Sequence, residues 1–178
     1  MKRPPDTLLT EWSWAHCLNQ VKAMARLLPV AVNKRPFALY GVPRGGLVFG
    51  LMLAHELDRE GNLAVQSMGQ GLVIPKGVEV AVVIDDVCET GATFKDVRAR
   101  FDKKVPVVCA AMVTKVRAEF DPDVSGVTLP DNIWITFPWE LAGADDPNKT
   151  WTDVVVKDAD APQVDYTAGV GEDGGTDE

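Results

Sequence analysis

VVIDDVCETGAT, residues 82–93, joins a continuous apolar run to two adjacent carboxylates and then to a threonine-glycine turn. The apolar run begins at Val78 and predicts a strand over residues 78–84 that is buried on both faces. Residues 92–101 are amphipathic and predict a helix. A strand that ends in acidic residues and turns through glycine into a helix is typical of the carboxyl edge of a parallel sheet, where ligands bind.

Strands and helices alternate on both sides of this stretch. Short apolar runs predict further strands over residues 37–42, 63–67, 105–114 and 132–137. Helical spacing predicts a helix over residues 14–28, which follows Thr10 as a possible cap and is stopped by Pro29, and a second over residues 45–61 closed by Gly61. Apolar strands that alternate with helices indicate an α/β fold with a mainly parallel sheet flanked by helices.

The net charge of −8 comes from the end of the chain. Residues 1–140 contain 16 basic and 16 acidic side chains, whereas residues 141–178 contain two lysines and ten acids. The final residues, AGVGEDGGTDE, are too polar to bury the apolar surface that ordering requires. We therefore expect a working domain over residues 1–140 and a mostly disordered acidic tail over residues 141–178. The tail is either a solubilising extension or a surface for an interaction partner.

Composition disfavours several other classes of protein. No basic patch is present that would bind nucleic acid through its phosphates, and no apolar stretch reaches the ~18 residues that span a membrane. The cysteines Cys17, Cys88 and Cys109 are odd in number, widely spaced and without a CxxC pair. This pattern favours reduced thiols and a cytoplasmic location over a disulfide framework or a zinc site.

Two loops at the predicted sheet edge carry ligand-binding chemistry: VPRGG (residues 42–46) and the acidic turn after residue 84. Backbone N–H groups of residues 90–93, at the start of a helix, can bind a phosphate. Asp85 and Asp86 offer acceptors for sugar hydroxyls, directly or through a divalent cation. The turn therefore fits a sugar phosphate. The simpler alternative is that the acids cap the helix and the glycine only turns the chain.

Four segments resemble one enzyme family. VVIDDVCETGAT resembles the phosphoribosyl-pyrophosphate (PRPP) signature of the type I phosphoribosyltransferases: an apolar strand, two acids, two variable residues, an acid, and Thr-Gly-x-Thr. VPRGGLVFGLMLAHEL (42–57), PDNIWITFPWE (130–140) and TEWSWAHCLNQVKAMARLL (10–28) resemble the pyrophosphate loop, the purine-side segment and the N-terminal helix of bacterial xanthine-guanine (6-oxopurine) phosphoribosyltransferases. The resemblance implies the type I fold, in which helices flank a mainly parallel sheet beside a small hood.

The resemblance also implies a reaction: 5-phosphoribose passes from PRPP to a purine nitrogen, giving a nucleoside monophosphate and pyrophosphate, with Mg²⁺ as cofactor. The residues that match the 5-phosphate loop are Glu89, Thr90, Gly91, Ala92 and Thr93. Asp85 and Asp86 would face the ribose and the metal, with Glu140 as a third acid on the metal side. Arg44 and Gly45 would bind pyrophosphate. We also expect a homo-oligomer, either a dimer or a tetramer.

On the base side, the resemblance assigns Lys115, Trp134 and Ile135 to the purine. An ammonium only donates hydrogen bonds, so Lys115 would favour guanine, xanthine or hypoxanthine over a 6-amino purine. Trp134 would stack on the ring, and the Ile135 backbone would face its exocyclic edge. Glu89 matches the acid proposed to act as the catalytic base near purine N7. Each assignment has a simpler alternative, since a lysine at a strand end is usually solvated and a strand tryptophan usually belongs to the core.

The chain departs from the family pattern at three places: the third acid of the signature, the phosphate-binding loop, and the loop that closes over the active site. Glu89 is one methylene longer than the usual aspartate, and Ala92 stands where a second glycine is common. The family's long closing loop corresponds here to the short segment 68–77, whose single charge is Lys76, so exclusion of water is in question.

These departures keep a second function open: a PRPP- or nucleotide-binding regulator that transfers nothing.

Two questions about individual residues also stay open. Cys88 is either a small filler or a reactive thiol beside the phosphate. The family often has a cis peptide in the pyrophosphate loop, and Pro43 makes a cis bond there less costly.

Overall fold

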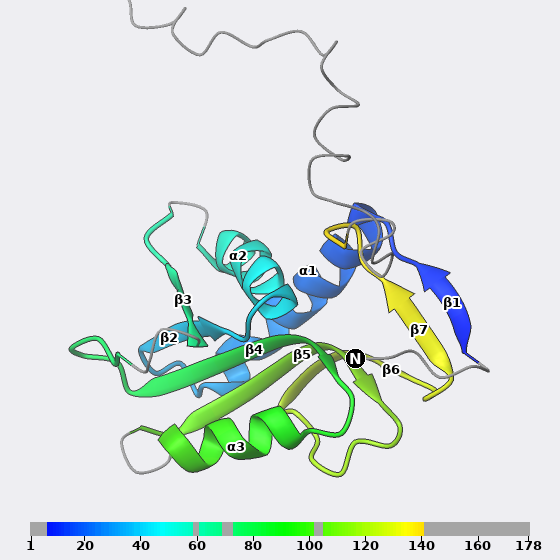
Figure 1. Cartoon of the computed structure of the whole chain (residues 1–178). Helices are drawn as coiled ribbons and strands as arrows, with labels where there is room; N and C mark the ends of the chain where they lie inside the picture. The colour runs from blue at the N-terminus through cyan, green and yellow to red at the C-terminus, as the bar shows by residue number, and fades with distance from the viewer. Residues whose placement is uncertain (1–6, 59–60, 69–72, 102–104, 141–178) are drawn as a thin grey trace, which may run out of the picture. The chain divides into compact units, whose positions relative to one another are not determined.

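The computed structural model describes residues 7–58, 61–68, 73–101 and 105–140. The predicted tail, residues 141–178, lies outside the described residues. The elements, in chain order (Figure 1), are β1 (Leu8–Glu11), α1 (Trp14–Ala31), β2 (Phe37–Gly41), α2 (Gly45–Leu57), β3 (Val65–Ser67), β4 (Val80–Cys88), α3 (Ala92–Phe101), β5 (Val107–Lys115), β6 (Val124–Leu129) and β7 (Ile133–Thr136).

Five strands form one parallel sheet in the order β3-β2-β4-β5-β6. The chain starts this sheet at β2, moves outward to β3, and then crosses back to β4. The strand order therefore reverses between β2 and β4. In open parallel sheets the crevice beyond the strand ends at such a reversal is the usual ligand site. The loops that follow β2 and β4, at residues 42–44 and 89–91, meet at this crevice.

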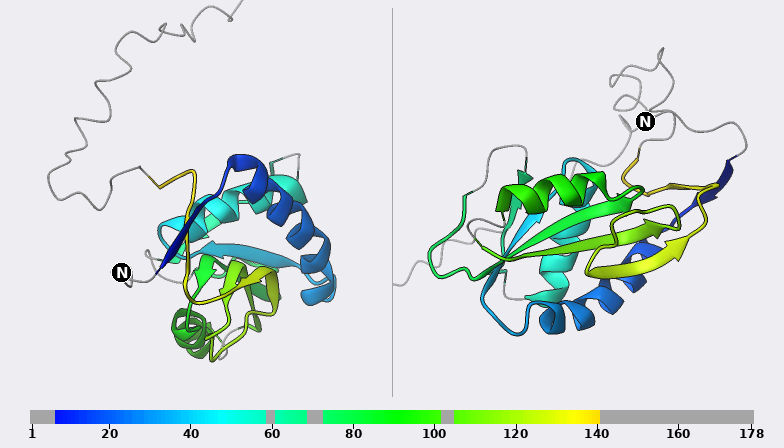
Figure 2. Two further views of the ribbon diagram at one scale, coloured as in Figure 1. Left: turned by 90° about the vertical axis from the view of Figure 1, so that its right-hand side faces the viewer. Right: turned by 90° about the horizontal axis from the view of Figure 1, so that it is seen from below.

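The apolar strands are covered on both faces, as their composition predicts. Helices α1 and α2 lie on one side of the sheet and α3 on the other (Figures 1 and 2). In β4, Val82 and Ile84 belong to the core beneath α1 and α2, whereas Ala81 and Val83 pack in the core beneath α3. The predicted α/β fold, with a parallel sheet flanked by helices, is confirmed.

A separate two-stranded parallel sheet pairs β1 with β7. Its register runs from Leu8 opposite Ile133 to Glu11 opposite Thr136, so the two ends of the described chain close on each other (Figure 2). This sheet corresponds to the expected hood. Strand β1 was not predicted because its four residues have no buried face, with Leu8 63% exposed.

Helix α1 begins at Trp14, as predicted, but has a different cap and a later end. Ser13, not Thr10, caps it: its hydroxyl accepts a hydrogen bond from the His16 backbone N–H at 3.3 Å. Pro29 lies inside the helix and does not stop it. Near the C-terminus proline removes a single helical hydrogen bond, and burial of Leu28 and Val32 keeps the last turn in place.

Two other boundaries also move. Helix α2 ends at Leu57, before the predicted Gly61, because Asp58 adopts an extended conformation. Strand β4 continues past Ile84 to Cys88, because Val87 still pairs with Val113 of β5. The strand therefore includes both aspartates, which the hydropathy pattern placed after it.

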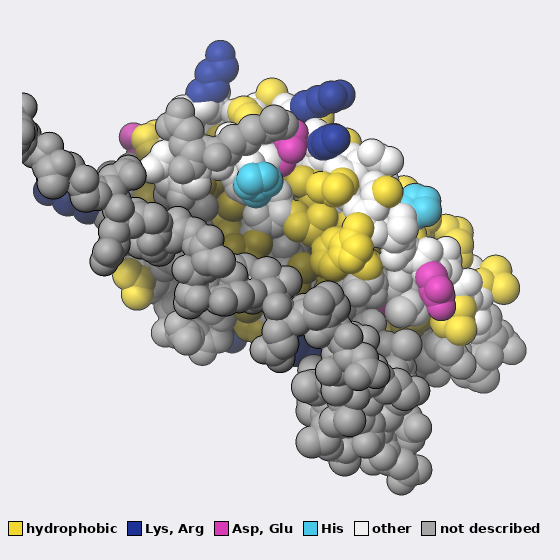
Figure 3. Space-filling view, turned by 90° about the horizontal axis from the view of Figure 1, so that it is seen from above, with side chains coloured by type: hydrophobic (Ala, Val, Ile, Leu, Met, Phe, Trp, Pro, Cys, Tyr) yellow, Lys and Arg dark blue, Asp and Glu magenta, His cyan; other side chains and the backbone are white. Residues whose placement is uncertain are grey.

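The outer face of α1 and α2 carries apolar side chains. Figure 3 shows this side of the molecule from above, with hydrophobic groups exposed among scattered charged ones. The exposed large hydrophobic residues of the two helices are Trp14, Leu18, Leu27, Val30 and Leu51. Within the part of the chain that the structure describes, no helix combines the length and apolarity needed to cross a membrane.

Candidate active site

The two aspartates of the signature lie side by side in the last part of β4. Asp85 Oδ1 accepts a hydrogen bond from the Asp86 backbone N–H at 3.0 Å, and Asp86 Oδ1 accepts one from the Val87 N–H at 3.0 Å. Burial raises the pKa of Asp85 to about 8, and the negative charge of Asp86 adds to the shift.

This pKa leads to a stability prediction. Folding raises the pKa of Asp85 from 3.8 to about 8. Its contribution to the stability of the folded state is therefore full below pH 3.8 and is lost as the pH rises through about 8. Asp85→Asn cannot ionise, yet its Oδ1 can keep the bond to Asp86. We expect the variant to be more stable than wild type by a few kcal/mol at pH 9 and by much less at pH 5. Thermal unfolding at both pH values measures this difference, and equal differences would contradict the assignment.

The loop after β2 packs directly against these acids, and its two glycines make this contact possible. A Cβ atom at Gly45 would lie 1.6 Å from Asp86 Oδ2, and one at Gly46 would lie 2.4 Å from the Ile84 carbonyl oxygen. The Val42 N–H also donates to Ile84 O at 2.8 Å, which extends the β2–β4 pairing into the loop. The Gly-Gly pair therefore has a structural reason: the backbone must touch the end of β4.

The cis peptide in this loop is the Pro43–Arg44 bond. A cis peptide therefore occurs in the loop where the resemblance led us to expect one. It follows the proline, so it is not the bond that proline makes less costly, and only that part of the expectation was wrong. The Arg44 side chain is exposed, and it is not among the residues that line the two cavities described below.

The first cavity, here called the signature cavity, lies between the two loops and has a volume of about 290 Å³. Its lining residues are Val42, Pro43, Asp85, Asp86, Val87, Cys88, Glu89, Thr90, Gly91, Ala92, Thr93 and Phe94. Helix α3 begins at Ala92, so the first N–H groups of the helix face this space. Gly91 has φ +79°, and a Cβ there would lie 2.4 Å from Phe120 O.

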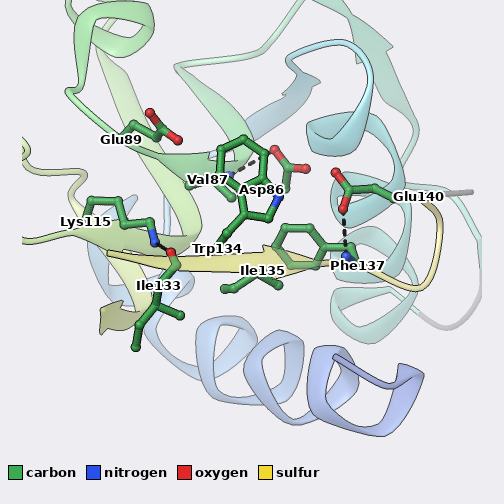
Figure 4. Close-up of a pocket in the computed structure, with 9 residues that line it drawn as sticks. All are labelled: Asp86, Val87, Glu89, Lys115, Ile133, Trp134, Ile135, Phe137 and Glu140. Carbon is green, nitrogen blue, oxygen red and sulfur yellow. Dashed lines mark hydrogen bonds between the residues drawn. The ribbon is translucent and has the colours of Figure 1, made fainter. Parts of the chain in front are cut away.

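The second cavity, here called the lysine cavity, adjoins the first and has a volume of about 200 Å³. Its lining residues are Asp86, Val87, Glu89, Lys115, Ile133, Trp134, Ile135, Phe137 and Glu140. In Figure 4 the Trp134 indole lies between Lys115 and Glu89 on one side and Asp86 and Glu140 on the other. The two cavities share Asp86, Val87 and Glu89.

Lys115, the last residue of β5, is 5% exposed. Its ammonium donates to the carbonyl oxygen of Ile133 (Figure 4). It also donates to the carbonyl oxygen of Pro130 at 3.4 Å. Burial lowers the pKa of Lys115, and the nearby carboxylate of Glu89 partly opposes that shift. An ammonium has three N–H donors, so one remains for a ligand after both carbonyls are satisfied. The simple alternative of a solvated lysine is wrong.

The β7 side of the lysine cavity is aromatic. Trp134 is half-buried, Ile135 is 6% exposed and Phe137 is 2% exposed. Phe137 stacks on Trp139 at a centroid distance of 4.6 Å, and its N–H donates to Glu140 Oε2 at 2.8 Å. Trp134 therefore lines a cavity, as predicted, although Phe137 was not identified from the sequence.

The predicted metal-side acids do not converge into a cage. Asp85 and Asp86 line the signature cavity, whereas Glu140 lines the lysine cavity with Asp86. Across the described ranges, no three His, Cys, Asp or Glu side chains are grouped closely enough to hold a metal ion by themselves. Two adjacent carboxylates still fit Mg²⁺, which typically keeps several waters and takes its remaining oxygens from substrate phosphates.

Solved structures share this architecture. The purine phosphoribosyltransferase of Pyrococcus horikoshii is 25% identical, with a TM-score of 0.58 over 75% of this chain and 95% of that one. The xanthine-guanine-hypoxanthine phosphoribosyltransferase of Helicobacter pylori is 19% identical, with a TM-score of 0.64 over 75% and 95% of the two chains. The chain has the type I phosphoribosyltransferase fold.

A third structure with this phosphoribosyltransferase fold, a hypothetical protein of Neisseria gonorrhoeae with bound ppGpp, is 19% identical, with a TM-score of 0.61 over 78% and 93% of the chains. No family model matches the sequence. At these identities the likeness establishes the fold, and the activity must be argued from the site.

One charged residue of this phosphoribosyltransferase-fold site has no signal in the sequence. Arg117, just after β5, forms an ion pair with Glu89 at 2.6 Å. The two residues are far apart in the chain, and no local pattern connects them. They meet only because β4 and β5 are neighbouring parallel strands whose carboxyl ends lie together.

All three cysteines are free thiols in the interior of this fold, with Cys88 3% exposed and the other two fully buried. Burial raises the pKa of Cys17 and Cys88 to about 11 and that of Cys109 to about 12. At pH 8 we expect iodoacetamide to label the native protein about 100-fold more slowly than the same thiols in guanidinium chloride. Rapid labelling of native Cys88 would instead support the reactive-thiol alternative.

Proposed function

We propose that this protein transfers 5-phosphoribose from PRPP to a 6-oxopurine base (guanine, xanthine or hypoxanthine), giving a nucleoside monophosphate and pyrophosphate. One observation carries the proposal: two adjoining cavities, one suited to a sugar phosphate and one to a planar base, share a wall that includes Asp86 and Glu89. The reacting carbon and the attacking nitrogen would meet at that wall.

The signature cavity is the proposed PRPP site. The 5-phosphate would bind at the start of α3, on residues 89–93, where the first N–H groups of the helix favour an anion. Asp85 and Asp86 would accept the ribose hydroxyls and hold Mg²⁺, which would neutralise the pyrophosphate. Gly45 would offer a bare N–H to the pyrophosphate, and Arg44, exposed at the start of α2, would have to turn inward to reach it.

The lysine cavity is the proposed purine site. Its volume of about 200 Å³ is below the range of pockets for drug-sized molecules and suits a single nucleobase. The free N–H of Lys115 would meet O6, Trp134 would stack on the ring, and the Ile135 backbone would face the exocyclic group. With both substrates in line, catalysis is mainly positioning and charge stabilisation, and Glu89 would take the proton from the base nitrogen.

A pyrophosphate-release assay tests the proposal directly. The full chain would be incubated with PRPP, Mg²⁺ and, separately, guanine, xanthine, hypoxanthine, adenine and uracil. We expect release with at least one 6-oxopurine and loss of release when EDTA removes the metal. If no base releases pyrophosphate, the transfer activity is rejected.

The second candidate is a regulator that binds PRPP or a nucleotide without transfer. Two observations favour it: Glu89 is already paired with Arg117, and segment 68–77, where the family has its closing loop, is short. Residues 69–72 of that segment lie outside the described residues, so its closure stays a prediction. The Neisseria gonorrhoeae protein that shares the fold was solved with ppGpp bound. Saturable PRPP binding without pyrophosphate release would select this function.

Location and assembly complete the proposal. Three buried, unpaired thiols support a reducing, cytoplasmic environment. The apolar side chains on α1 and α2, with Leu51 60% exposed and Val30 77% exposed, support assembly into a homo-oligomer. Light scattering of the purified chain would measure its mass in solution.

A further inference from the structure

Glu89 and Arg117 lie where the two proposed substrate sites meet. Glu89 lines both cavities, its side chain is 17% exposed, and its Oε2 contacts Arg117 NH2 at 2.6 Å. The Arg117 side chain is 42% exposed. The guanidinium therefore holds the Glu89 carboxylate from the solvent side of the shared wall.

Backbone hydrogen bonds, and not the arginine side chain, hold the segment that carries Arg117 in place. The Arg117 N–H donates to Asp131 Oδ1 at 2.9 Å, the Ala118 N–H to Lys115 O at 3.0 Å, and the Glu119 N–H to Thr90 O at 3.1 Å. All three bonds survive truncation of the Arg117 side chain. The guanidinium is therefore not needed to hold this segment in place.

The length of Glu89 explains why it needs a partner. A glutamate has one more rotatable bond than an aspartate, so its carboxylate samples more positions unless something fixes it. Proton transfer requires the carboxylate within hydrogen-bond reach of the substrate nitrogen, and an error of about 1 Å can cost on the order of 100-fold in rate. The ion pair with Arg117 restricts the carboxylate to one place beside both cavities.

We propose that Arg117 is a positioning residue that sets the Glu89 carboxylate on the wall shared by the signature cavity and the lysine cavity. The inference rests on the proposed function and deepens it, because it assigns a role to a residue outside the signature. The extra methylene of Glu89 makes its carboxylate more mobile, and the ion pair with Arg117 removes that mobility.

The test compares Arg117→Ala, Arg117→Lys, Glu89→Asp and the double variant Glu89→Asp/Arg117→Ala. We expect Arg117→Ala to lower kcat about 10- to 100-fold while the KM for PRPP changes less than about threefold. Arg117→Lys, which keeps the charge, should recover most of the loss. In the Glu89→Asp background, removing Arg117 should change kcat less than about twofold, because the shorter acid lacks the extra rotatable bond that the guanidinium restricts.

Arg100→Ala is the matched control, since Arg100 forms an exposed ion pair with Asp96 within α3, at 2.5 Å. Its kcat should equal that of wild type. If Arg117→Ala keeps the wild-type kcat, or if its loss is the same in the Glu89→Asp background, the positioning role is overturned while the proposed reaction stands.

The wild-type measurements decide the proposed function separately. If wild type binds PRPP and GMP but transfers nothing, the proposed transfer fails, and the positioning role fails with it because that role acts on the proton-transfer step. If wild type binds neither PRPP nor GMP, the proposed function fails and the inference fails with it.

Discussion

Asp86→Asn is expected to weaken PRPP binding at least about 100-fold while leaving the fold intact. Asp86 lines both cavities and faces the backbone of Gly45, so its charge lies where ribose, metal and pyrophosphate would meet. Asparagine has nearly the same shape, and its Oδ1 can still accept the Val87 N–H. The loss would therefore report the missing charge. Calorimetric titration with PRPP in the presence of Mg²⁺ measures it.

A second variant that removes a charge distinguishes the effect of losing charge at the ligand site from the effect of losing charge elsewhere on the protein. Asp96 lies on the exposed side of α3, paired with Arg100, and is not among the residues that line either cavity. Asp96→Asn should bind PRPP as wild type does. Thermal unfolding should show both variants folded. If Asp86→Asn retains the wild-type affinity, the aspartates do not belong to the ligand site.

Lys115→Ala is expected to remove the preference for 6-oxopurines over adenine. The buried ammonium of Lys115 can donate a hydrogen bond to O6 of guanine. The 6-amino group of adenine cannot accept that bond, so an N–H of Lys115 stays unpaired, at a cost of about 2–3 kcal/mol. That cost corresponds to roughly 30- to 150-fold in kcat/KM. The ratio of kcat/KM for guanine to that for adenine measures the preference and should fall toward one in the variant.

The ratio is the right readout because Lys115 also has a structural role. Its ammonium satisfies the carbonyl oxygens of Ile133 and Pro130, so the alanine variant also loses stability. A general loss of stability lowers both rates together and leaves their ratio unchanged. Trp134→Ala is the companion variant: it should weaken all purines alike, since every purine presents a face for stacking. If wild type uses adenine as readily as guanine, Lys115 does not select the base.

The sequence by itself determined the central architecture. Continuous apolar runs can be buried only between two layers, so they predict parallel strands covered by helices. The structure confirms β2, β5 and α3 close to their predicted bounds, and β4 with a later end at Cys88. Asp86, Glu89 and Lys115 lie around adjoining cavities, as the sequence led us to expect for residues near the carboxyl ends of neighbouring parallel strands, although β4 continues past Asp86 to Cys88.

Tertiary structure decided what depends on partners distant in the chain. Strand β1 has no buried face of its own and exists because β7 offers it a parallel edge. Pro29 stays within α1 because its neighbours are buried against the sheet, which outweighs its local preference. The Glu89–Arg117 pair and the contact of Gly45 with Asp86 join residues on different strand ends. Hydropathy and turn signals report only local conformational preference. Contacts between distant residues depend instead on which strands are neighbours in the sheet.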